Sequence, residues 1–241
     1  MLDIKLKISM KIIETALKLF KNPMLCFSGG KDSTLMLYLT AQVCKMKKLD
    51  MPLILVSDPF PILENYEFCI KTLKKFNIDK FIVFNNFIDE ECLNNYIEKT
   101  HSCEKCCYYC KVRVLNKIIE KFNIDAVFVA VRWDEHEARS DDDYIRLVEN
   151  PKHYRVEPIL HLTFMDVLQF YIENPQLLNP LYLKGYTSLG CEPCTKRTID
   201  KTFTNINDYV MYIIQSQVKE REGRLQDKER IMERLRRLGY F

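Results

Sequence analysis

Glycine is scarce in this chain. Six of its 241 residues are glycine, namely Gly29, Gly30, Gly185, Gly190, Gly223 and Gly239. Glycine adopts backbone conformations that strain other residues, so a chain that uses it this rarely is expected to keep it where a loop requires it. We therefore expect these positions to mark functional loops.

Long hydrophobic runs and a strong net charge are also lacking. No apolar stretch reaches the roughly 18 residues that indicate a membrane-spanning helix, and residues 1–7 lack the apolar core of a signal peptide. The net charge of +3 is too small to indicate nucleic-acid binding by itself. The sequence therefore predicts a cytoplasmic protein that does not contact a membrane.

Cysteine, in contrast, is abundant, with ten residues. A cytoplasmic chain does not use its cysteines as a disulfide framework. Cys26, Cys44, Cys69 and Cys92 stand alone in apolar contexts and are expected to be small core residues. The other six are clustered and require a chemical explanation: Cys103, Cys106, Cys107, Cys110, Cys191 and Cys194.

Apolar runs alternate with segments of helical periodicity over the first two thirds of the chain. The runs predict buried strands at 23–27, 53–56, 81–84 and 126–131. Between them, helices are predicted at 9–21, 32–46, 63–76 and 107–122. This alternation is typical of parallel βαβ units, so we expect an α/β core over residues 1–160.

Residues 161–241 are less regular. Helices are predicted at 163–173, 202–216 and 224–238, and a loop rich in proline and glycine at 175–198. We expect this part to form a C-terminal loop and helical extension that packs on the core.

The most informative segment is Ser28-Gly29-Gly30-Lys31-Asp32-Ser33, directly after the first predicted strand. A glycine turn at this place lets backbone N–H groups converge on an anion at a helix N-terminus. Two serine hydroxyls add donors and Lys31 adds charge, so the segment predicts a phosphate-binding turn. Its spacing differs from that of the ATPase P-loop, Gly-x-x-x-x-Gly-Lys-Ser/Thr.

Asp58 and Arg132 also lie just after predicted strands. Parallel α/β sheets bind ligands at the carboxyl ends of their strands, so both residues are expected to face the same crevice as the glycine turn. Arg132 and Arg139 carry guanidinium groups that suit sulfate or phosphate oxygens. The alternative is surface ion pairing with the acidic residues nearby, Asp134, Glu135 and Glu137.

The clustered cysteines form Cys-x-x-Cys pairs. Two consecutive pairs lie within residues 103–110, and a third pair is Cys191 with Cys194. Such pairs can hold a tetrahedral zinc ion or a cubane iron–sulfur cluster, and unrelated core thiols are the third possibility. The adjacent Cys106 and Cys107 argue against zinc, whose ligands are usually spaced by two or more residues.

Residues 28–33 resemble the PP-loop of the N-type ATP pyrophosphatases, written SGGKDS in that superfamily. The resemblance implies a Rossmann-like, doubly wound parallel sheet of the adenine nucleotide alpha hydrolase type. It also implies that the nucleotide is ATP or an adenylyl sulfate, with Mg²⁺ if ATP is the substrate. Ser28 to Ser33 would hold its phosphates or sulfate, and Asp58 would lie near the nucleotide.

Residues 105–112 and 190–195 resemble the CC…CxxC signature of assimilatory adenylylsulfate reductases, within the phosphoadenosine phosphosulfate (PAPS) reductase family. The resemblance implies a [4Fe–4S] cluster beside the substrate, with Cys106, Cys107, Cys191 and Cys194 as its ligands. Residues 131–139 are similar to a segment that these reductases share with the ATP sulfurylase small subunit. Arg132 and Arg139 would there neutralise the anion.

The C-terminal tail resembles a different relative. Residues 221–227 and 239–241 look like the C-terminus of the ATP sulfurylase small subunit, and no cysteine follows Cys194. The reductases carry a nucleophilic cysteine near the C-terminus. A reductase built on this chain would therefore use Cys103, Cys110 or a partner's thiol as its nucleophile.

Three reactions are compatible with these features. The first is reduction of adenylyl sulfate or its 3′-phosphorylated form, with a thiol or electron-donor protein as partner. The second is ATP-dependent adenylyl transfer, which normally requires a GTPase partner. The third is cluster-dependent thiolation of tRNA or DNA, for which residues 219–237 are the one basic candidate.

Our hypothesis is the first reaction, carried out by a homo-oligomer. The candidate catalytic residues are Lys31, Arg132, Arg139, Cys103 and Cys110.

Overall fold

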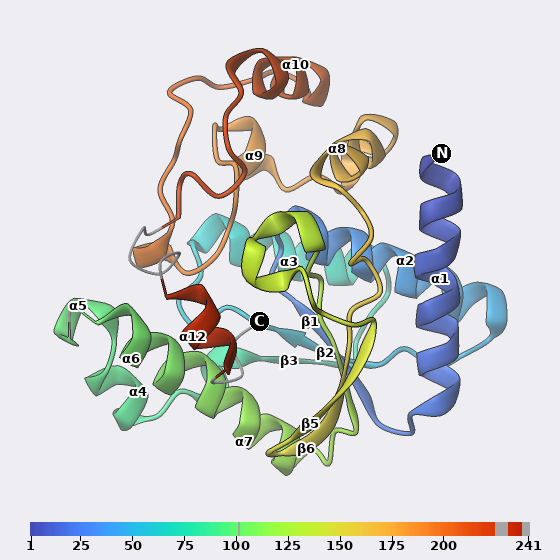
Figure 1. Ribbon diagram of the computed structural model, residues 1–241, viewed down its shortest axis with the longest axis vertical. Helices are drawn as coiled ribbons and strands as arrows, with labels where there is room; N and C mark the ends of the chain where they lie inside the picture. Colours follow the sequence, from blue (N-terminus) through green and yellow to red (C-terminus); the bar gives the residue numbers. More distant parts are fainter. Residues whose placement is uncertain (101, 225–230, 238–241) are drawn as a thin grey trace.

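The structure is a computed structural model that describes residues 1–100, 102–224 and 231–237 (Figure 1). Part of the helix predicted at 224–238 lies outside these residues. Within the described part, no helix is both long and apolar enough to cross a membrane.

A six-stranded sheet forms the centre of the fold, in the order β3-β2-β1-β4-β6-β5. Its strands are β1 (Pro23–Phe27), β2 (Leu53–Val56), β3 (Phe81–Val83), β4 (Ala126–Phe128), β5 (Ile145–Glu149) and β6 (Lys152–Val156). The four predicted strands are confirmed as β1 to β4, all parallel. The chain order reverses between β1 and β4, so the predicted doubly wound α/β fold is confirmed.

The strands β5 and β6 are absent from the sequence prediction. They form an antiparallel hairpin, and β6 then pairs in parallel with β4. The sheet is therefore not wholly parallel, because β5 is an antiparallel edge strand. These strands carry polar side chains, and β6 buries His153 and Arg155, so neither strand forms the apolar run that indicates a buried strand.

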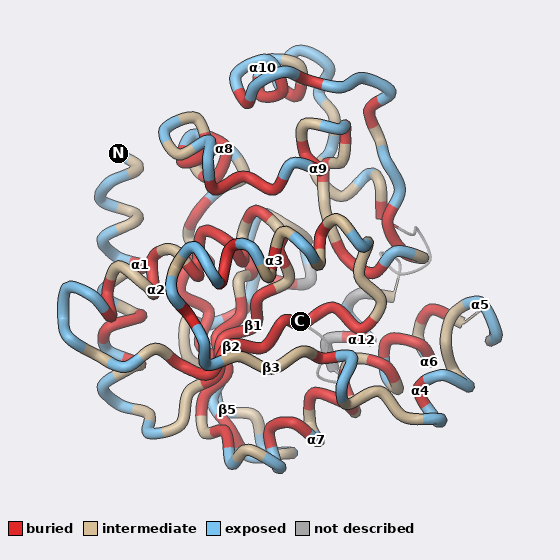
Figure 2. Tube along the Cα trace, turned by 180° about the vertical axis from the view of Figure 1, so that it is seen from behind, coloured by how far each residue is buried: buried red, intermediate tan, exposed pale blue. Residues whose placement is uncertain are grey.

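Helices cover both faces of the sheet (Figure 1). The helices α1 (Leu2–Leu19), α2 (Lys31–Lys47) and α3 (Leu63–Lys75) pack on one face in the larger hydrophobic core. On the other face, α7 (Arg113–Lys121) packs against β1, β2 and β4. Figure 2 shows β1 and β2 largely buried, with β1 fully buried from Met24 onward.

The cysteine-rich segment is helical. It comprises α4 (Glu90–Asn94), α5 (Ile97–Thr100) and α6 (Cys103–Cys107), followed by a π-helical turn, Tyr108–Val112, that continues into α7. The helix predicted at 107–122 is thus part of a helical stretch that begins at Cys103. Single π-turns inside helices are frequent at functional sites.

The C-terminal part contains α8 (Phe164–Glu173), α9 (Pro180–Leu183), α10 (Ile206–Ser216) and α12 (Met232–Arg237). Thr163 and Asp166 form a capping box that starts α8. Short 3₁₀ turns lie at Phe84–Phe87, Trp133–Glu135, Glu137–Arg139, Pro175–Leu177 and Glu192–Cys194. The larger core contains residues from both sides of residue 160, among them Leu25, Phe128, Phe170 and Tyr209.

Candidate active site

The glycine turn lies at the carboxyl end of β1 and leads into α2, which begins at Lys31. The Ser33 hydroxyl fixes the turn internally. Ser33 Oγ accepts a hydrogen bond from the Ser28 backbone N–H at 3.3 Å, donates to the Gly30 carbonyl at 3.0 Å and lies 3.0 Å from Ser28 Oγ. The predicted strand, turn and helix are all present.

Side chains far away in the sequence hold the turn from outside. Asn65 on α3 donates to the Ser28 carbonyl at 2.9 Å, and Asn179 donates to the Gly29 carbonyl at 3.0 Å and to Asn65 Oδ1 at 2.7 Å. The Tyr182 hydroxyl accepts from the Lys31 backbone N–H at 2.9 Å. None of these three residues was predicted as part of the site, because nothing local to them indicates a contact with this turn.

Gly29 adopts a backbone φ of +73°. A Cβ at this position would lie 2.4 Å from Asn65 Oδ1 and 2.6 Å from Cys69 Sγ. We therefore expect Gly29→Ala to lower the free energy of unfolding by about 1–3 kcal/mol, the cost of holding a strained residue. Urea unfolding, followed by circular dichroism, measures the change.

Gly30→Ala is the matched control for this change. Gly30 has a φ of −72°, and the nearest atom to an added Cβ would be 3.5 Å away. Equal stability of the two variants would contradict the assigned geometry of the turn.

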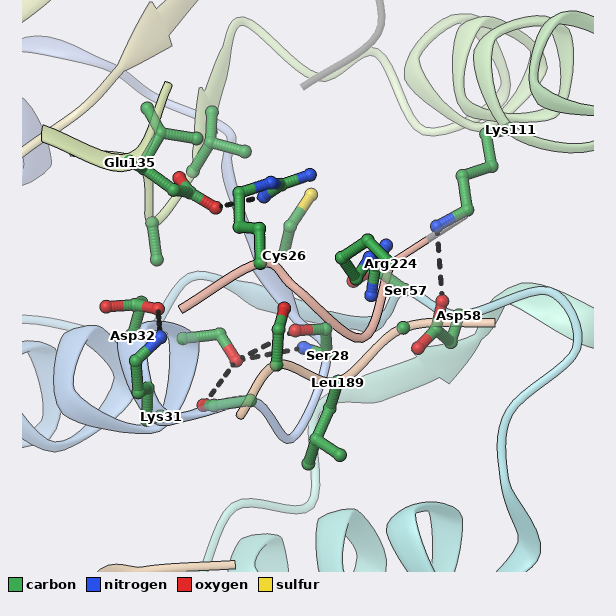
Figure 3. Close-up of a pocket in the computed structure, with 18 of the residues that line it drawn as sticks. Cys26, Ser28, Lys31, Asp32, Ser57, Asp58, Lys111, Glu135, Leu189 and Arg224 are labelled. Carbon is green, nitrogen blue, oxygen red and sulfur yellow. Dashed lines mark hydrogen bonds and ion pairs between the residues drawn. The ribbon is translucent and has the colours of Figure 1, made fainter. Parts of the chain in front are cut away.

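A pocket of about 790 Å³, counted with its open mouth, lies beside the turn (Figure 3). Of the predicted residues, it is lined by Ser28, Gly30, Lys31, Asp32, Ser33, Asp58 and Arg139. Its cationic lining residues are Lys31, Lys111, Arg139, Arg221 and Arg224, and its acidic ones are Asp32, Asp58 and Glu135. The size suits a small-molecule ligand, and the charge favours an anionic one.

Sequence reasoning missed Arg221 and Arg224 as pocket residues, although both belong to the tail motif. Arg224 pairs with Thr195 in an isolated β-bridge, and its guanidinium lies against Gly190. A Cβ on Gly190 would lie 2.1 Å from Arg224 Nη1. The absence of a side chain at Gly190 therefore gives Arg224 its place in the pocket wall.

Arg132 does not line the pocket, because it is completely buried. Its guanidinium donates to Asp134 Oδ1 at 3.0 Å and also pairs with Asp32 and Glu220. Lys31, which is 3% exposed, pairs with Asp32 at 2.8 Å and with Glu220. Glu220 belongs to the C-terminal tail and was not predicted as a site residue.

Burial and charge act against each other in this cluster. Burial lowers the pKa of Lys31, but Asp32 and Glu220 outweigh it and hold that pKa above its usual value. Burial raises the pKa of Asp32, but Arg132 and Lys31 outweigh it and lower that pKa. For Glu220, burial dominates over the same two cations, so its pKa is raised.

Arg139 lies at the pocket wall, 3.6 Å from Glu135, and Arg221 pairs with the same carboxylate at 2.5 Å. Burial raises the pKa of Glu135, but Arg139 and Arg221 reverse the effect and lower that pKa well below its usual range. The sequence offers ion pairing with nearby acidic residues as the alternative role of these arginines. Arg132 does pair with Asp134, and Arg139 pairs with Glu135. These pairs are buried rather than on the surface.

The cysteines of the α6 segment divide between two faces. Cys103 and Cys107 pack with Val112 and with Leu235 of α12. Cys106 and Cys110 pack with Cys92 instead, and the Cys110 thiol donates to the Cys92 carbonyl at 3.1 Å. Neither Cys103 nor Cys110 lines the pocket, so the structure does not bring these two candidate nucleophiles to the nucleotide site.

The pair formed by Cys191 and Cys194 lies next to the cysteines of the α6 segment. Cys191 forms a β-bridge with Pro61, and the Glu192 backbone N–H donates to the Phe60 carbonyl at 2.8 Å. The Phe60 ring packs on Tyr96, between α4 and α5, at 4.1 Å between ring centroids. Interaction with the neighbouring Cys110 side chain lowers the pKa of Cys106 against the opposing effects of burial, Cys107 and Cys194.

Asp58 connects the cysteines to the pocket. Its Oδ1 accepts hydrogen bonds from Cys191 Sγ at 3.4 Å and from Lys111 Nζ at 3.2 Å. Lys111 reaches across the pocket to Asp58 from the π-helical turn (Figure 3). The predicted nucleotide residue Asp58 therefore lies at the boundary between the pocket and the cysteine pairs.

The predicted cluster ligands Cys106, Cys107, Cys191 and Cys194 are all buried. In the part of the chain that the structure describes, no three His, Cys, Asp or Glu side chains form a group that could hold a metal ion. The donor set still fits a thiolate-bound cluster in chemistry, because two buried cysteine pairs lie on adjoining segments.

The comparisons with known proteins agree with the fold. Residues 22–197 match the family model for the phosphoadenosine phosphosulfate reductase domain. Sulfate adenylyltransferase subunit 2 of Proteus mirabilis is 26% identical, over 97% of this chain and 95% of that protein.

Two solved structures share the fold. A PAPS reductase from Candida auris, solved as a phosphate complex, has a TM-score of 0.61 at 16% identity, over 81% of this chain and 96% of that one. A U34-tRNA thiolase from Methanococcus maripaludis, solved with its [4Fe-4S] cluster, has a TM-score of 0.52 at 15% identity, over 99% of this chain and 81% of that one. The family match and the pocket together support one conclusion: the chain belongs to the phosphoadenosine phosphosulfate reductase domain family.

Proposed function

We propose that the pocket binds an adenine nucleotide and that the protein is an ATP-dependent adenylyltransferase. The main support for this proposal is the set of side chains that line the pocket. Five cationic side chains line it beside the glycine turn. Among the described residues, Cys26 is the single cysteine of the lining, and burial raises its pKa to about 12.

Adenylyl transfer needs no thiol in the pocket. An oxyanion attacks the α-phosphorus of ATP, the bond to pyrophosphate breaks, and pyrophosphate leaves. The turn at Ser28–Ser33 would hold the phosphates, while Arg139, Arg221 and Arg224 would neutralise charge on the transferring and leaving groups. Mg²⁺ would accompany ATP. The name of the Proteus relative, a subunit, supports a partner protein for this chain as well.

Reduction of adenylyl sulfate or its 3′-phosphorylated form is the second candidate. The hydrogen bond between Cys191 and the pocket residue Asp58 favours it, because a nucleotide bound in the pocket would then lie close to this cysteine pair. A [4Fe–4S] cluster on Cys106, Cys107, Cys191 and Cys194 would supply redox-active iron beside the pocket.

Since Cys103 and Cys110 lie away from the pocket, a partner would have to supply the thiols for reduction. The first thiolate attacks sulfur and breaks the bond from sulfur to the bridging oxygen, releasing AMP from adenylyl sulfate or adenosine 3′,5′-bisphosphate from its 3′-phosphorylated form. The second thiol releases sulfite and forms a disulfide, so the two thiols supply both electrons.

Anaerobic calorimetric titrations separate the two candidates. Adenylyl transfer predicts that MgATP binds and that magnesium pyrophosphate, the leaving group, competes with it. Reduction predicts that a sulfonucleotide binds at least about 100-fold more tightly than MgATP, a difference of roughly 2.7 kcal/mol, and that pyrophosphate does not compete. The second pattern would overturn the proposal of adenylyl transfer.

A further inference from the structure

A segment of the C-terminal tail enters the anion site. Residues 217–224, which we call the strap, follow α10 and carry Glu220, Arg221 and Arg224. Glu220 Oε1 pairs with Lys31 and Glu220 Oε2 pairs with Arg132. One carboxylate thus bridges the two predicted anion-binding cations, as two oxygens of a phosphate or sulfate would.

Four cations in and beside the pocket already face carboxylates of the protein. Lys31 and Arg132 face Asp32 and Glu220, and Arg132 also faces Asp134. Arg139 and Arg221 face Glu135. These contacts match four cations with four carboxylates, so an entering anion finds no excess positive charge at Lys31 or Arg132.

We propose that Glu220 is an internal anion that occupies the site of a nucleotide phosphate or sulfate, and that the nucleotide displaces it. This inference rests on the proposed nucleotide binding and adds a regulatory contact to the same pocket. Displacement removes one negative charge from the cluster and uncovers Arg132, which is completely buried in this structure.

Glu220 is the carboxylate whose departure leaves the cluster intact. Without it, Lys31 keeps Asp32, and Arg132 keeps both Asp32 and Asp134. Asp32 cannot leave in the same way, because it lies in the first turn of α2, where the positive helix end stabilises a carboxylate. Burial also raises the pKa of Glu220. The ionised carboxylate is therefore more stable in water than in its buried position.

The strap begins at the end of α10 and is anchored after Glu220. Before it, Gln217 ends α10 in the left-handed conformation, with a φ of +50°. After it, the Gly223 carbonyl accepts from the Lys196 backbone N–H at 2.9 Å, and Arg224 forms the bridge with Thr195. Glu220 can therefore turn away while Arg224 keeps its place in the pocket wall.

Glu220→Gln tests the proposal, with Glu222→Gln as the matched control. Both variants remove one negative charge from the strap, but Glu222 is exposed. Calorimetric titration with ATP and with inorganic pyrophosphate, both without metal, should show binding to Glu220→Gln about tenfold tighter than to wild type, or roughly 1.4 kcal/mol. Glu222→Gln should bind as wild type does. Thermal melting checks that both variants fold.

Two outcomes would overturn the proposal while wild-type binding stands. Equal affinities of Glu220→Gln and Glu222→Gln would show that Glu220 does not compete with the ligand. Weaker binding of MgATP to Glu220→Gln than to wild type would assign Glu220 to a magnesium site instead. If wild type and Glu220→Gln both bind none of these ligands, the proposed nucleotide site itself fails.

Discussion

Replacing Arg132 by methionine is expected to lower the free energy of unfolding by about 3–5 kcal/mol, the cost of breaking a buried ion pair by removing one partner. Arg132 is completely buried and contacts Asp32, Asp134 and Glu220. Methionine fills much of the same volume but leaves buried carboxylates without this cation. Urea unfolding, followed by circular dichroism, measures the loss.

Lys71→Met is the control for this experiment. Lys71 is 78% exposed and pairs with Glu67 one helical turn away, so its loss should change stability by no more than about 0.5 kcal/mol. The double variant Arg132→Met with Glu220→Gln should lose less stability than the sum of its single changes. Glutamine at position 220 removes one of the carboxylate charges that Arg132→Met leaves without its cation. An Arg132→Met variant as stable as Lys71→Met would refute the assigned ion pairs of Arg132 with Asp32, Asp134 and Glu220.

The second large effect is expected at the cysteine pairs. Cys191→Ala should abolish the visible absorbance of the anaerobically purified protein, together with its bound iron and acid-labile sulfide. Cys191 is buried beside Asp58 and is one of four proposed ligands, and an iron–sulfur cluster depends on its thiolate ligands. Iron and sulfide analysis, read with the absorbance spectrum, measures the loss.

Cys44→Ala serves as the matched control. Cys44 is also a buried cysteine, but it lies on α2 and its thiol donates to the Asp50 carbonyl at 3.5 Å. Its iron and sulfide content should equal that of wild type. Unchanged iron and sulfide in Cys191→Ala would remove Cys191 from the ligand set, and wild-type protein without iron would refute the cluster itself.

The parts of the fold that sequence predicts well are those whose signal is local. The segment 28–33 specifies a strand end, a glycine turn and a helix start within six residues, and all three are present. The strands β1 and β2 are continuous apolar runs and have the predicted bounds. In β6, by contrast, Lys152, His153 and Arg155 interrupt any apolar run, and burial of Arg155 follows from packing that no local pattern shows.

The candidate site is harder to predict because its contacts join distant segments. Glu220 pairs with Lys31 across 189 positions of the chain, and Asn179 reaches Gly29 across 150. The sequence predicted Arg132 as an anion-binding residue, but the carboxylate of Glu220 that pairs with it lies in the tail. The division of Cys103 and Cys110 between two helix faces likewise depends on the packing of α4 and α12.

Calorimetric titration of the wild-type protein with MgATP and with adenylyl sulfate tests the central claim, that this pocket is a nucleotide site. We predict saturable binding of one nucleotide per chain, weakened by about 2 kcal/mol in Lys31→Ala, the scale of a charge-assisted contact. The claim would be contradicted if neither nucleotide bound to the wild-type protein. Equal affinities of wild type and Lys31→Ala would contradict it as well.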